Sequence, residues 1–202
     1  MEGFYFFWFA WIFWVILTFF FPKKKLRMQA TVGILGLIIF SSVTTDFLSF
    51  EVGISCLLLQ VYGYYQLRNE PLYSLLYLCI ITWLLSASYA TFHFLEVFDP
   101  VMLLVERSWL LGSIMAIMLL ILGAKKERRV AVLFLGLAQG EWLTGLGFRY
   151  AFHERVIGGL MFLDVLAIAI CLVSIWYGME WLANRLALFI EREQSMKPNK
   201  SA

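Results

Sequence analysis

Four ionisable side chains lie inside long apolar stretches of the chain and are the first candidates for chemistry. Glu106 and Arg107 fall near the start of one stretch, Glu141 lies in the next, and Asp164 lies in the last. A charged side chain at the centre of a bilayer costs about 2.5–3.5 kcal/mol on insertion scales, so it needs a partner or a function. A carboxylate in such a place can pair with the arginine, meet a polar solute or exchange protons.

The chain that must position these groups is too apolar for an ordinary soluble domain. Of its 202 residues, 62% are hydrophobic and 15% are charged, against about 45–50% and about 25% in typical soluble domains. The connections between apolar stretches are too short to bury a core of their own, which excludes a soluble catalytic module. The cations fall in short clusters, so no basic face could follow a phosphate backbone and no nucleic acid partner is expected. Membrane lipids are the expected surroundings.

Seven apolar runs are long enough to cross a bilayer, since a helix rises about 1.5 Å per residue and the hydrocarbon layer is roughly 30 Å thick. The runs are residues 3–21, 28–45, 50–67, 72–92, 101–123, 130–148 and 157–177. They predict an all-α polytopic bundle, with residues 1–177 as a seven-helix transmembrane domain. Residues 178–193 carry apolar side chains at helical spacing, which favours an amphipathic cytoplasmic helix that lies at the interface or prolongs the helix of the run 157–177. Residues 194–202 are expected to form a disordered tail.

Positive charge is distributed unevenly between the connections, which predicts the orientation of the bundle. Most of the 16 lysines and arginines follow the first, third, fifth and seventh runs. The opposite side holds Arg107, Arg149 and Arg155. Because Lys and Arg concentrate in cytoplasmic loops, the N-terminus is predicted outside and the C-terminus in the cytoplasm.

Three of the four ionisable groups are expected at one depth. Glu141 lies about two turns before the outer end of the run 130–148, and Asp164 lies about two turns after the outer start of the run 157–177. Both positions are roughly 10 Å below the outer surface, and Arg107 is expected at about 9 Å. The sequence therefore predicts a polar layer of Arg107, Glu141 and Asp164 in the outer half of the bundle, with Glu106 beside it.

Three interpretations of this layer remain open. It could be a dry cluster that pairs internally and fixes the register of the helices. It could line a polar cavity, open to the outside, in which a carboxylate exchanges protons or meets a polar solute. The third interpretation is that Glu141 or Asp164 is simply protonated, because burial disfavours the charged form.

Small residues on the run 130–148 predict a close helix contact. Gly136 and Gly140 form a small-xxx-small pair, and the run 157–177 carries small residues on the face of Asp164. We therefore expect these two runs to pack closely. The same glycines could instead serve another membrane protein or a second copy of this chain.

A second tier of polar residues is expected at the outer surface. His93 and Glu96 end the run 72–92, and His153 lies in the last outer connection. Their spacing matches no zinc pattern, so solvated interface residues are the favoured interpretation, and no metal or cofactor is expected. The chain also lacks the His-Glu-x-x-His and Gly-x-Ser-x-Gly patterns, so no catalytic residue is predicted.

Three features of the chain together carry a resemblance to a known family. They are the opening Met1-Glu2-Gly3 with its aromatic run, the seven compact runs, and the stretch Gly140-Glu141-Trp142. The chain resembles the small YphA-like integral membrane proteins of bacilli over nearly its whole length. This resemblance implies a location in a bacterial plasma membrane, and it implies no catalytic residue, cofactor or partner.

Three hypotheses of function follow, and the first is favoured. It is a non-enzymatic membrane component that acts through helix or tail contacts. The second is a small proton-linked transporter or solute-binding protein that uses the polar layer. The third is a membrane enzyme acting on lipid.

Reporter fusions test the predicted threading. Reporters joined at residues 126 and 198 are expected on the same, cytoplasmic side, because both positions follow an odd number of crossings and lie beside Lys and Arg. Paired fusions to a periplasm-active enzyme and to a fluorescent protein measure the side. Reporters on opposite sides would show that the run 130–148 or the run 157–177 fails to cross.

Overall fold

The computed structural model describes residues 2–20, 22, 25–47, 50–98, 106–123, 125–151 and 156–196. This part of the chain forms helices, one short hairpin and one 3₁₀ turn. The elements are α1 (Phe4–Phe20), α2 (Lys25–Phe40), β1 (Thr44–Phe47), β2 (Phe50–Gly53), α3 (Ile54–Leu67), α4 (Leu72–Phe98), α5 (Arg107–Ile121), η2 (Lys126–Arg128), α6 (Arg129–Ala151) and α7 (Leu160–Met196). The predicted all-α class is confirmed.

Three helices are long and apolar enough to cross a membrane. The stretches that qualify are Leu72–Phe98 in α4, Lys126–Phe148 in η2 and α6, and Leu160–Leu188 in α7. The apolar helices α1 and α5, and the stretch Arg27–Phe40 of α2, are shorter. By length and composition, the described part of the chain therefore holds three helices that could cross a membrane and several shorter ones.

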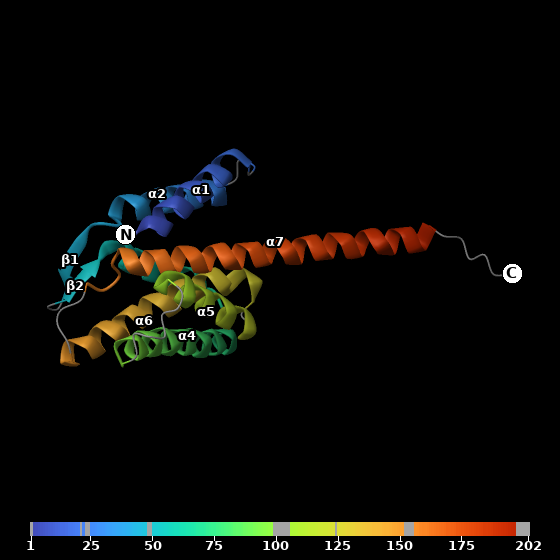
Figure 1. The fold of residues 1–202 in the computed structure, drawn as a ribbon. Coiled ribbons are helices and arrows are strands. Elements are labelled where there is room, and N and C mark those ends of the chain that lie inside the picture. Colours follow the sequence, from blue (N-terminus) through green and yellow to red (C-terminus); the bar gives the residue numbers. More distant parts are fainter. Residues whose placement is uncertain are drawn as a thin grey trace.

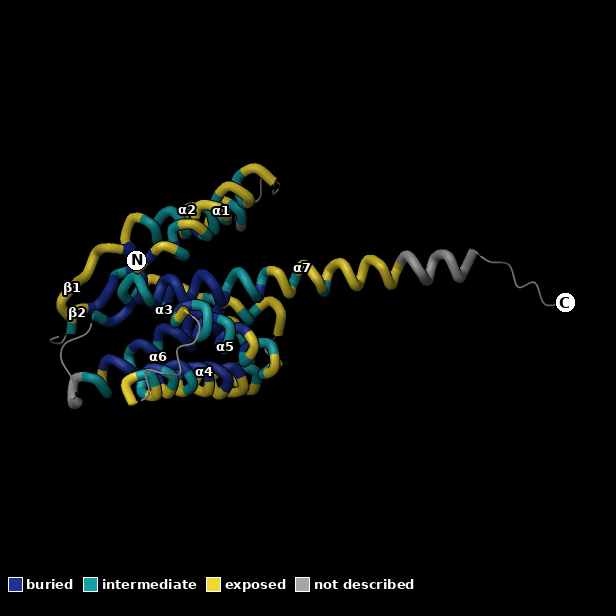
Figure 2. The backbone as a smooth tube through the Cα atoms, viewed as in Figure 1, coloured by how far each residue is buried: buried dark blue, intermediate teal, exposed yellow. Residues whose placement is uncertain are grey.

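The long helix α7 organises the bundle. The pair α1 and α2 lies on one side of it, and α4, α5 and α6 lie on the other (Figure 1). The N-terminus, the hairpin and the start of α7 share one end of the bundle, and η2 lies at the opposite end. The first half of α7 is buried among the other helices, and residues 181–188 lie beyond them with exposed side chains (Figure 2).

A β-hairpin replaces the first turn of the predicted run 50–67. Strands β1 and β2 pair antiparallel from Thr44 opposite Gly53 to Phe47 opposite Phe50. Strand β2 is also tied to the residues before α7, because Gly53 N–H donates to the Ile157 carbonyl at 2.8 Å and Ile157 N–H donates to the Glu51 carbonyl at 2.8 Å. Aromatic and β-branched residues such as these favour strands when cross-strand partners are available.

Other boundaries differ from the predicted runs for local reasons. Because Ile157 is extended and Gly158 has a φ of +74°, α7 begins only at Leu160. It then continues to Met196, so residues 178–193 prolong α7. Residues 101–105 and 197–202 lie outside the described residues. Since α5 begins at Arg107, a depth counted from a helix starting at residue 101 does not hold for that side chain.

The glycines of α6 face α4. A Cβ atom at Gly136 would lie 2.8 Å from Leu85 Cβ, and one at Gly140 would lie 2.8 Å from Tyr89 Cβ. The prediction that these glycines bring α6 close to α7 is therefore wrong. Small residues allow a close approach but do not specify the partner. In the structure, Gly112 of α5 makes the close approach to α7, since its Cβ would lie 2.9 Å from a methyl carbon of Ile168.

Ion pairs clamp the end of the bundle that carries η2. Arg128 Nε donates to Glu70 Oε1 at 2.7 Å, and its Nη1 donates to the Gln66 carbonyl at 2.6 Å, which joins η2 to the end of α3. The Ser74 hydroxyl and Arg128 hold the pKa of Glu70 below its ordinary value, against the opposing effect of desolvation. Glu180 of α7 pairs with Lys126 and, at 3.5 Å, with Arg129. The basic residues of this turn therefore hold three helices together.

Two matched glycine substitutions test the contact between α4 and α6. Gly140→Ala is expected to destabilise the protein by about 1–3 kcal/mol, because its Cβ overpacks against Tyr89. Gly178→Ala, in α7, meets nothing within 4 Å and is expected to stabilise by about 0.5–1 kcal/mol through helix propensity alone. Thermal unfolding of the purified protein in detergent measures both. A higher melting temperature for Gly140→Ala would contradict this packing.

Candidate functional site

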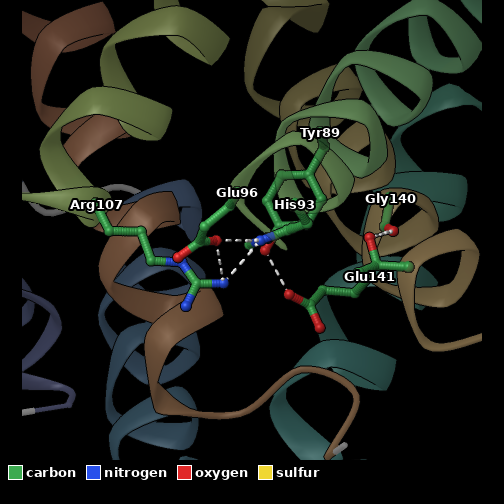
Figure 3. A network of polar contacts seen from close by, with 7 residues as sticks. Tyr89, His93, Glu96, Arg107, Gly140 and Glu141 are labelled. Atoms are coloured by element: carbon green, nitrogen blue, oxygen red, sulfur yellow. Dashed lines mark hydrogen bonds and ion pairs between the residues drawn. The ribbon is translucent and has the colours of Figure 1, made fainter. Parts of the chain in front are cut away.

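The first polar cluster joins the end of α4 to the start of α5. Arg107 Nη2 lies 2.9 Å from Glu96 Oε2 and 2.8 Å from His93 Nδ1. His93 is 1% exposed, so its ring is enclosed by protein. Figure 3 shows the three side chains converging from the two helices. A partly exposed arginine is thus neutralised at short range by a carboxylate of the preceding helix.

Spacing along α4 places this cluster. Tyr89, His93 and Glu96 are separated by four and three residues, so they lie on one face of the helix. Arg107 is the first residue of α5, and its long side chain reaches back across the end of α4. The connection between the two helices contains residues outside the described part of the chain, but both of its ends are fixed by this ion pair.

His93 Nδ1 has two competing partners. It lies 2.8 Å from Arg107 Nη2 and 3.5 Å from Glu96 Oε2. A guanidinium only donates, so contact with Arg107 requires Nδ1 to accept and the ring to be neutral. A protonated Nδ1 would instead donate to Glu96. The state of one proton therefore decides which of the two neighbours the imidazole binds.

The second cluster surrounds Glu141 of α6. Its carboxylate accepts a hydrogen bond from the Tyr89 hydroxyl of α4 and one from the Gly158 backbone N–H at 3.1 Å. Glu141 is 2% exposed and Tyr89 is 1% exposed. Gly158 must be glycine, because its φ is positive and a Cβ there would collide with Cys56. The edge contact between the Tyr89 and His93 rings, with centroids 4.6 Å apart, links the two clusters.

Both clusters face one cavity. It has a volume of about 600 Å³ and is lined by His93, Glu96, Arg107 and Glu141 together with Glu2 and apolar residues at the start of α7. Glu2 and Val97 are exposed, so they mark where the cavity meets the surface. The structure therefore brings Arg107 and Glu141 to a common space while each retains a protein partner of its own.

Asp164 and Glu106 serve a different contact. The Asp164 carboxylate of α7 accepts hydrogen bonds from the backbone N–H groups of Gly3 at 2.7 Å and Phe6 at 2.8 Å. The first N–H groups of a helix have no partner within the helix, so Asp164 acts as an N-terminal cap supplied by another helix. The Tyr5 hydroxyl binds Glu106. Neither carboxylate is among the residues that line the cavity, and both secure α1.

Two members of the site, Tyr89 and Gly158, are not among the residues predicted from the sequence. Tyr89 carries a signal that could have been found, since it lies one helical turn before His93 on the same face. Gly158 carries a weaker one, the Gly-Gly pair that precedes α7. His153 lies outside the described residues. In the described part of the chain, no group of three or more His, Cys, Asp or Glu side chains is placed to hold a metal ion.

Comparisons with known proteins point to one family. The sequence matches the family model for "YphA-like integral membrane protein" over residues 2–200. It is 27% identical over 212 residues to "Uncharacterized protein YphA" of Bacillus subtilis (strain 168), a match that covers 100% of this chain and 98% of that protein. No solved structure matches the chain.

Substitution of Asp164 tests its role as a cap. Asp164→Asn is expected to destabilise the protein by about 1–2 kcal/mol, because an amide cannot accept both backbone hydrogen bonds with the same strength. Amide hydrogen exchange should become faster in the first turn of α1. Asp46→Asn, on the exposed hairpin strand β1, is the control. Unchanged exchange in Asp164→Asn would contradict the capping contact.

Proposed function

Because the chain belongs to the family of YphA-like integral membrane proteins, we propose that it binds a small charged solute within the membrane, in the cavity between α4, α5, α6 and α7. One observation carries the proposal. A cavity of about 600 Å³ brings a cation, carboxylates and an imidazole together at the end of an apolar bundle. Ligand sites have this size and are typically apolar with a few converging polar groups. We infer binding without chemical conversion.

The charges around the cavity support a cationic solute. Glu2, Glu96 and Glu141 contribute carboxylates, against Arg107 as the fixed cation. Since Arg107 is already paired with Glu96, the remaining carboxylates favour a positive group. Leu160 and Phe162 line the same space and offer apolar contact. A small organic cation, with an ammonium group and a short apolar part, fits this combination.

The two partners of His93 support a link between binding and protonation. A cation that approaches Glu96 competes with Arg107 for that carboxylate, and protonation of Nδ1 competes for it as well. The solute and the proton therefore both change the partners of the Glu96 carboxylate. This coupling is what a proton-linked transporter requires, and we propose it as the use of the site.

We propose that all seven helices cross the plasma membrane of a bacterium, with the cavity open to the outside. Helix α3 has 14 residues and spans only about 21 Å, but strand β2 leads directly into it and adds length. The basic turn η2 lies at the end opposite the cavity, and such turns favour the cytoplasm. The relative from Bacillus subtilis supports a bacterial membrane.

The projecting half of α7 favours a second candidate function. Trp181, Leu182 and Leu186 are 61%, 54% and 56% exposed beyond the bundle. A long apolar helix of this kind suits contact with the membrane surface or with a partner helix. The protein would then act as a non-enzymatic component that recruits a partner through α7.

Ligand-induced stabilisation tests the solute site. We expect choline to raise the melting temperature of the purified protein and acetate to have no such effect. Glu141→Gln should weaken choline binding by about 10-fold to 100-fold, because it removes a negative charge that attracts the quaternary ammonium, an effect of about 1.5–3 kcal/mol at a few ångströms in a partly buried site. Asp46→Asn, far from the cavity lining, should bind normally. Equal stabilisation by acetate, or normal binding by Glu141→Gln, would contradict the proposal.

A further inference from the structure

A second cavity lies on the other side of α7 and has no charged side chain among its described lining residues. Its volume is about 470 Å³, and it runs between α1 and α2 on one side and α6 and α7 on the other. Along α1 the lining extends from Phe6 to Leu17, and Ser174 of α7 is the one lining residue with a hydroxyl group. We call this space the lateral groove.

The dimensions of the lateral groove match a single hydrocarbon chain. The distance from Phe6 to Leu17 along a helix is about 16 Å, so a volume of about 470 Å³ corresponds to a mean cross-section of about 30 Å². The groove is therefore long and wide enough for an extended alkyl chain.

The surroundings make an empty groove unfavourable. Apolar walls without a neighbour lose dispersion contacts, and α1 presents Trp8, Trp11 and Ile12 to the surroundings on its exposed side. Helix packing in a membrane depends on such contacts rather than on the exclusion of water. A hydrocarbon chain lying between α1 and α7 would supply the missing dispersion contacts.

One end of the lateral groove is basic. Arg27 Nη1 donates to the Thr18 carbonyl at 3.2 Å, and Thr18 follows Leu17 at the end of the lining. A guanidinium has five N–H donors, so it can bind a phosphate oxygen in addition to a protein partner.

We propose that the lateral groove holds one acyl chain of an anionic phospholipid, with the headgroup phosphate beside Arg27. The lipid comes from the leaflet at the end of the bundle that carries η2. The lipid fills the space between α1 and α7. Its site is separate from the solute cavity, which lies on the other side of α7.

Native mass spectrometry of the protein released from detergent tests this site. The probes are phosphatidylglycerol and phosphatidylcholine added at equal concentration. We expect the unmodified protein to retain one phosphatidylglycerol molecule. Ala10→Phe places a ring in the groove and should abolish this retention. Ala87→Phe, at an exposed position of α4, is the matched control and should retain the lipid.

A charge substitution tests the headgroup separately. Arg27→Gln should reduce the preference for phosphatidylglycerol about fivefold, the factor that corresponds to one arginine near an anionic lipid. Arg68→Gln, at the end of α3, is the control and should leave the preference unchanged. This comparison tests the binding of the anionic headgroup even if Ala10→Phe does not fold.

Three results would overturn the proposal. One is equal lipid retention by Ala10→Phe and Ala87→Phe, and another is equal retention of the two phospholipids by the unmodified protein. The third is a dimer that Ala10→Phe dissociates, which would assign the groove to a second copy of the chain.

Discussion

A polar group buried in the apolar interior of a membrane protein has little water to bind, so it must find its partner within the protein. This requirement organises the end of the bundle opposite η2. The first N–H groups of α1 are satisfied by Asp164, the carboxylate of Glu141 by Tyr89 and Gly158, and Arg107 by Glu96. These contacts join the helices, and the cavity lined by Glu96, Arg107 and Glu141 is the space left between two of them.

The sequence predicted which residues need such partners but not which partners they find. Hydropathy located the helices, because lipid imposes a minimum apolar length. It also singled out Asp164 and Glu141 as polar groups in apolar surroundings. Their partners are 161 residues away at Gly3 and 52 residues away at Tyr89. Such pairings are set by the packing of all the helices, which no local pattern encodes.

Local sequence rules failed where the same residue pattern is compatible with two different structures. Residues 50–53 are apolar enough to begin a helix, but they form a strand because β1 and Ile157 offer backbone partners. A short apolar run does not distinguish the two conformations. Gly136 and Gly140 were recognised as a contact face, yet the face is filled by α4. The sequence could predict that a helix packs closely against these glycines, but it could not predict which helix.

The capping of α1 by Asp164 has a consequence for how the chain is assembled. The ribosome makes α1 first and α7 last, and the carboxylate that satisfies the amino end of α1 belongs to α7. Until α7 has been made, the first N–H groups of α1 lack this carboxylate and need another hydrogen-bond partner. A nascent chain that ends before Asp164 leaves this end without its carboxylate, so the cap is one sign that translation has reached the last helix.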